Sequence, residues 1–128
     1  MAREACDIGR KQDYLYRLMV HQNTSELKSC ASQVQDRLRR HACCHPSLRQ
    51  LIHSDALQRP MVLRAMVLFA MHVDDDFMQW LLEHTGSCSV SLSKFRHDHL
   101  PAHVNQLLNG DTVLDDFVSN ATVDYICC

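Results

Sequence analysis

The chain has 128 residues, of which 46% are hydrophobic and 22% charged, and its formal net charge is -2. This composition excludes a largely disordered protein, and the length is that of one domain that can bury a core without disulfides or metals. Three glycines and three prolines are too few for the many tight turns of a β-sandwich or barrel. We therefore predict a single all-α domain over residues 1–128, a compact orthogonal bundle of six or seven short helices around a central apolar helix.

Charged residues occupy the N-terminal positions where a signal peptide would have an apolar stretch. The seven cysteines are an odd number without framework spacing, which indicates free thiols in a reducing compartment. The most apolar run, 61–73, contains Arg64 and is shorter than the ~20 residues that a membrane crossing needs. We expect a cytoplasmic protein without a membrane partner.

Three helices are predicted in the first part of the chain. Apolar residues at helical spacing predict the first over residues 8–21. Asn23, followed three residues later by Glu26, predicts the capped start of a second helix. Pro46 should end this helix, because proline has no amide hydrogen to donate. A short third helix is expected over residues 48–52.

The central apolar helix is predicted at about 60–73. Pro60 suits its first turn, and the following residues are apolar on nearly every side, as expected of a helix surrounded by others. Three consecutive aspartates, 74–76, predict the start of the next helix, where carboxylates accept hydrogen bonds from free amides. Residues 77–82 provide its apolar face, and Gly86 should end it.

The serine-rich segment 87–95 has two interpretations. Its alternation of polar and apolar residues suits a short strand, whereas Ser91 or Ser93 could cap a helix. The helix is favoured, because a lone strand would have no partner elsewhere in the chain. A further helix is predicted over residues 101–109, closed by Gly110.

A last helix is predicted near the end of the sequence, with Asp111 or Thr112 as its cap. Its spacing predicts four inward-facing side chains, those of Val113, Leu114, Phe117 and Val118. The apolar residues of segment 123–126 either extend this helix or form a packed tail.

The two halves of the sequence carry opposite charge. Residues 1–64 contain eleven Lys and Arg against six Asp and Glu, and residues 65–128 contain two against nine. In one interpretation the halves pack together and pair some of these charges. In the other, a basic and an acidic face contact different partners or second copies of the chain. The two interpretations are compatible.

The segment HACCHP (41–46) raises the question of a metal site. Zinc prefers four nitrogen or sulfur donors arranged as two spaced pairs, and the adjacent Cys43 and Cys44 cannot easily direct both sulfurs to one ion. His41 and His45 are further possible donors in this segment. A second group of candidate ligands comprises His97, His99 and His103. We favour a helix end without metal or cofactor, and a zinc-binding helical protein remains an alternative.

An enzyme is not predicted. The chain has no CxxC pair and no nucleophile motif, and its three glycines are too scattered for a phosphate-binding loop. The terminal Cys127 and Cys128 resemble the prenylated double-cysteine end of Rab-type small GTPases. Because the chain has no P-loop, no lipid anchor is expected.

Basic side chains in the first half suggest a nucleic-acid-binding regulator as the second hypothesis. They are Lys28, Arg37, Arg39, Arg40, Arg49, Arg59 and Arg64. Aromatic residues are absent from residues 25–55, and the acidic second half would repel a polyanion.

Methionine and aromatic side chains dominate the apolar residues of segment 61–80. Such side chains fill irregular cores, and they also line grooves that accept a partner helix. We therefore predict a non-catalytic module that binds another protein and self-associates, such as an adaptor, chaperone, inhibitor or small regulator. The predicted partner-binding residues are Met66, Met71, Met78, Trp80, Arg37, Arg39, Arg40, Asp74, Asp75 and Asp76.

Overall fold

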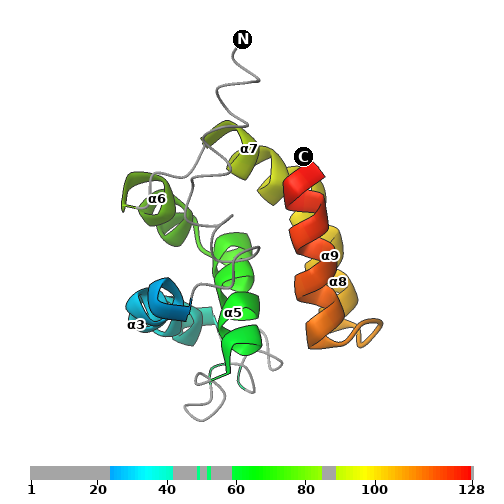
Figure 1. Cartoon of the computed structure of the whole chain (residues 1–128), viewed down its shortest axis with the longest axis horizontal. Coiled ribbons are helices and arrows are strands. Elements are labelled where there is room, and N and C mark those ends of the chain that lie inside the picture. Colours follow the sequence, from blue (N-terminus) through cyan, green and yellow to red (C-terminus); the bar gives the residue numbers. More distant parts are fainter. Residues whose placement is uncertain (1–23, 42–48, 50–51, 53–58, 85–88, 128) are drawn as a thin grey trace.

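The computed structural model describes residues 24–41, 49, 52, 59–84 and 89–127, and every regular element among them is helical (Figure 1). In chain order the helices are α3 (Thr24–His41), α5 (Pro60–Val73), α6 (Asp75–His84), α7 (Ser89–Lys94), the π-helix η2 (Phe95–His99), α8 (Leu100–Leu108) and α9 (Leu114–Cys127). The predicted all-α class is confirmed for this part of the chain. The predicted helix 8–21, most of the predicted helix 48–52 and the predicted turns at Pro46 and Gly86 lie outside the described residues.

The apolar helix α5 lies between α3 and α6 on one side and α8 and α9 on the other (Figure 1). It begins at Pro60, and residues 62–71 are all buried, including Arg64. Burial lowers the pKa of the Arg64 guanidinium from its usual value. Each fully buried large apolar side chain contributes about 1.5–3 kcal/mol relative to exposure, so this helix is a major source of stability.

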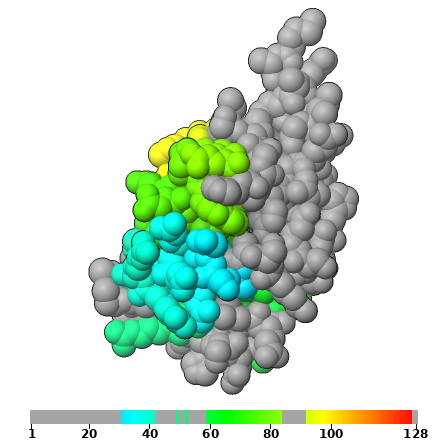
Figure 2. Space-filling model, turned by 90° about the vertical axis from the view of Figure 1, so that its left-hand side faces the viewer, coloured from blue at the N-terminus to red at the C-terminus, as the bar shows by residue number. Residues whose placement is uncertain are grey.

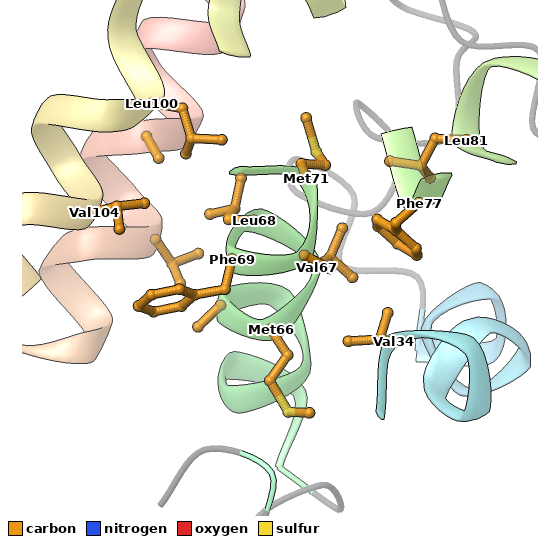
Figure 3. Close-up of a cluster of buried hydrophobic side chains, with 14 of the residues drawn as sticks. Val34, Met66, Val67, Leu68, Phe69, Met71, Phe77, Leu81, Leu100 and Val104 are labelled. Carbon is orange, nitrogen blue, oxygen red and sulfur yellow. The ribbon is translucent and has the colours of Figure 1, made fainter. Parts of the chain in front are cut away.

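Figure 3 shows how neighbouring helices cover α5. Val34 of α3 and Phe77 of α6 lie on one side of it, and Leu100 and Val104 of α8 on the other, all four being buried. In α3, Val34 and Leu38 are four residues apart, so both face α5. The helix α3 begins at Thr24, and Asn23, the predicted cap, lies outside the described residues.

The segment after Ser89 is helical, so the strand interpretation is wrong for the described residues 89–95. Leu92 and Phe95 are buried three residues apart, as on one face of a helix. The chain then widens into η2, where the Leu100 amide donates to the carbonyl of Phe95. A wider turn at this point accommodates Pro101, whose ring would clash with the carbonyl four residues earlier in a regular α-helix.

The helix α8 ends at Leu108, and Gly110 closes it as predicted. Gly110 has a φ of 80°, in the left-handed region that glycine adopts without steric cost, and its amide donates to Leu107 at 3.2 Å. Neither Asp111 nor Thr112 occupies the cap position of α9. That position belongs to Val113, whose carbonyl accepts the first helical hydrogen bond, from the amide of Phe117 at 2.9 Å.

The buried face of α9 packs through aromatic rings. The Phe117 ring lies 5.7 Å from that of Phe69 of α5, and the Tyr125 ring lies 5.3 Å from that of Phe95 in an edge-to-face arrangement. Segment 123–126 extends this helix, because α9 continues to Cys127. The prediction that Val113 faces inward is wrong, because this side chain is 64% exposed at the helix start.

Candidate functional site

The junction between α5 and α6 is organised by Asp74, which lies in extended backbone between the two helices. Its Oδ1 accepts a hydrogen bond from the amide of Phe77 at 3.0 Å, so it caps α6 as predicted. Its Oδ2 lies 3.2 Å from Nε2 of His41 at the end of α3. Because a carboxylate oxygen only accepts, the imidazole donates from Nε2. Both oxygens of this buried carboxylate are therefore hydrogen-bonded.

These contacts determine the charge state of Asp74. Burial alone would raise the pKa of its carboxyl group. The hydrogen bonds from Phe77 and His41, together with the positive charge of Arg37, outweigh burial and lower the pKa below its usual value. The folded state therefore favours the ionised carboxylate.

The two following aspartates each pair with a different cation. Asp76 Oδ2 lies 3.5 Å from Nη1 of Arg37 on α3, and the exposed Asp75 pairs with Arg96 of η2. Arg96 Nε also donates to the carbonyl of Met71 in the last turn of α5, at 2.5 Å. The three aspartates thus connect α5 and α6 to α3 and to η2.

The contacts of Asp74 and Asp76 with α3 support the first interpretation of the charge pattern, in which the two halves of the chain pack together, whereas Asp75 and Arg96 both belong to the acidic half. The residues predicted as partner-binding on this side are therefore brought together, largely by contacts within the fold. Figure 2 shows this face, where α3 in cyan lies beside the green segments. A shallow open pocket of about 380 Å³ lies here, lined by Arg40, His41, Val73, Asp74, Asp75 and Asp76.

The methionines predicted to form a binding groove lie in the core instead. Met66 and Met71 are 0% exposed and Met78 is buried as well. Trp80 is half-buried and stacks on Phe77, with the ring centroids 5.7 Å apart. The apolar surface predicted around Met66 and Met71 is therefore not exposed, because the neighbouring helices cover α5.

Exposed apolar side chains occur on α9 and directly before it. Val113, Val123 and Ile126 are 64%, 57% and 41% exposed and are the large exposed hydrophobic residues of the described chain. Three exposed acids adjoin the start of the same helix, namely Asp111, Asp115 and Asp116. We call these six residues the α9 surface. Sequence reasoning missed it, although helical spacing places Asp115 and Ile126 on the helix face opposite Phe117.

The predicted histidine group divides in the structure. Nε2 of His103 lies 2.5 Å from Oδ2 of Asp124, and Nδ1 of His99 lies 3.7 Å from the same oxygen. His97 is exposed. Across the described ranges, no group of three or more His, Cys, Asp or Glu residues is arranged to hold a metal ion. The histidine contacts instead connect η2 and α8 to α9.

The candidate ligands Cys43, Cys44 and His45 lie outside the described residues. The zinc alternative therefore remains a hypothesis for that segment.

Two of the basic residues predicted for nucleic acid have roles within the fold. Arg37 pairs with Asp76, and Arg64 is buried in α5. The exposed arginines of the described chain are Arg39, Arg40, Arg49 and Arg59.

Comparison of the chain with protein-family models, curated protein sequences and solved structures finds no significant match. Among the described helices, none combines the length and the apolar character that a membrane crossing needs.

Proposed function

We propose that this protein is a non-catalytic module that binds another protein through the α9 surface, as an adaptor, chaperone, inhibitor or small regulator in the cytoplasm. The observation that carries the proposal is the exposure of Val113, Val123 and Ile126 at one helix. For the whole chain we propose the bundle of six or seven helices around α5 that the sequence predicts.

The α9 surface combines the two properties that protein interfaces use. Covering one partly exposed Val or Ile side chain contributes about 1 kcal/mol, so several such contacts supply affinity. The neighbouring aspartates add a negative field, which favours basic partners and disfavours acidic ones. The nucleic-acid alternative is less well supported, because a polyanion would be repelled by these aspartates and Arg37 is already paired.

The proposal is tested by affinity capture from the native source with three versions of the chain. The first is the unmodified protein, and the second carries Val123→Glu and Ile126→Glu, which put charges into the apolar part of the surface. The third carries Ser32→Glu and Gln33→Glu at exposed positions of α3, which adds the same charge outside the α9 surface and serves as the matched control.

We expect captured proteins that bind the unmodified chain and the control but are lost, by about tenfold or more, from the double variant. Far-UV circular dichroism and thermal unfolding verify that all three versions are folded. A set of captured proteins that does not differ between the unmodified chain and the double variant would contradict the proposal.

A further inference from the structure

The negative charge of the α9 surface is not balanced locally. After Arg96 the chain contains five aspartates and no Lys or Arg. Asp124 of this set faces His103 and His99. Within the part of the chain that the structure describes, no ion pair involves Asp111, Asp115 or Asp116. These three carboxylates are therefore exposed and form no ion pair among the described residues.

Exposed arginines lie on the opposite side of the fold. Arg39 and Arg40 are exposed in the last turn of α3, a helix that contributes more basic than acidic residues. In Figure 1, α3 lies on one side of α5 and α9 on the other. The helices α3 and α9 of one copy are separated by α5, so a contact between the arginines and the α9 surface joins two molecules.

We propose that the α9 surface binds the Arg39 and Arg40 end of α3 in a second copy of this chain, which gives head-to-tail self-association. This inference rests on the proposed function, because it names the partner of the same surface. The aliphatic stems of the two arginines can cover exposed Val113, while their guanidinium groups meet Asp115 and Asp116. Because the two contacting surfaces differ, the interface is heterologous rather than two-fold symmetric.

Two charge-reversed variants test this arrangement. One carries Asp115→Lys and Asp116→Lys, and the other carries Arg39→Glu and Arg40→Glu. Each variant loses one of the two surfaces and keeps the other. Sedimentation velocity over a range of concentrations at low ionic strength measures the association of each variant alone and of their equimolar mixture.

We expect the unmodified chain to associate increasingly with concentration and to dissociate as salt is added. Each variant alone should associate at least about tenfold more weakly. The equimolar mixture should recover dimers and larger assemblies, because Arg39 and Arg40 of one variant meet the intact aspartates of the other and the introduced lysines and glutamates are also complementary. An interface that does not pair these two surfaces would not give this recovery.

Two controls keep the test decisive. Gln33→Glu on α3 and Gln106→Lys on α8 change exposed residues outside both surfaces and should associate like the unmodified chain. If the reversal at the start of α9 impairs folding, the pair Asp115→Asn and Asp116→Asn replaces it, with the same direction expected.

Three results would overturn the inference. These are a monomeric unmodified chain at every concentration, association unaffected by either reversal, and a mixture that does not recover dimers. The captured proteins lost from the variant with Val123→Glu and Ile126→Glu are measured separately. The proposed function therefore stands or fails on its own experiment, even when self-association is absent.

Discussion

Two groups of aspartates in this chain have similar sequences and different environments. Asp74 lies between α5 and α6, and Asp75 and Asp76 begin α6. These three residues contact His41, Arg96 and Arg37, respectively, each from another helix. Asp111, Asp115 and Asp116 lie at the start of α9, where no described cation pairs with them. The first group forms hydrogen bonds and ion pairs within the fold. The second group is exposed beside apolar side chains.

The comparison shows that a run of acids does not by itself indicate a binding site. The relevant difference is whether neighbouring helices supply hydrogen-bond donors to the carboxylates. At the α5–α6 junction, His41 lies at the end of α3 and Arg96 belongs to η2, so distant segments supply those donors. We therefore expect changes in the first group to alter stability, and changes in the second group to alter binding.

The largest effect is expected for Asp74→Ala. This change removes the cap of α6 and leaves His41 without its acceptor, so the free energy of unfolding should fall by about 2 kcal/mol. Urea denaturation followed by circular dichroism measures the loss. Asp74→Asn is the matched control, because its side-chain oxygen can still cap the helix, and it should lose less.

If the free energy of unfolding of Asp74→Ala were within experimental error of that of the unmodified chain, the two groups of aspartates would not differ in their effect on stability. Trp80, the single tryptophan, lies on α6 and gives a second probe of the same transition. Its fluorescence should shift at the same urea concentration as the circular dichroism if the domain unfolds as one unit.

A smaller effect is expected for Arg96→Gln. Arg96 joins the carbonyl of Met71 to the carboxylate of Asp75, but Asp75 is highly exposed and this ion pair contributes little in water. Loss of the hydrogen bond to the main chain should lower the free energy of unfolding by about 1 kcal/mol. Thermal denaturation measures the change, with Lys94→Gln as an exposed control of equal charge change two residues earlier.

If Arg96→Gln lowered the free energy of unfolding no more than Lys94→Gln does, Arg96 would not stabilise the α5–α6 junction.

The smallest effect is a pH dependence that arises from Asp74. Its pKa is lowered in the folded state, so the folded protein binds fewer protons at this group than the unfolded chain does. The resulting stabilisation is present above the ordinary aspartate pKa of about 3.9 and is lost as the pH falls through the lowered folded-state pKa. The stability difference between the unmodified chain and Asp74→Asn should therefore be larger at about pH 5 than at about pH 3.

Urea unfolding at the two pH values measures this difference. An unchanged or larger difference at the lower pH would show that the Asp74 carboxylate is not stabilised in its ionised form.

The helical class and several helix ends could be predicted from local sequence. Pro60 and Gly110 act through their own backbone geometry, and Asp74 caps a helix through the amide of Phe77 three residues later. Such effects depend on neighbours in the chain, so one sequence is enough to recognise them. The wider turn of η2 before Pro101 was not predicted, because a proline near a helix start is also compatible with a simple break.

The candidate site was less predictable because it depends on contacts between helices. Helical spacing indicates that Met66 and Met71 are apolar positions, but only the packing of the surrounding helices decides that they are buried. Val113 was assigned inward by the same spacing and is exposed, because it precedes the first turn of α9. Spacing identifies which residues share a helix face, whereas the side chains that cover this face come from distant parts of the chain.

The length of the π-helix η2 also determines in which direction the residues after it point around the helix axis. Within its five residues, Arg96 points back to the α5–α6 junction and His99 lies towards Asp124 of α9. Successive residues of a regular α-helix are rotated by about 100°, so deleting one residue here would turn everything after it by that angle. Because both ends of this short segment are held by contacts to different helices, its length is as important as its composition.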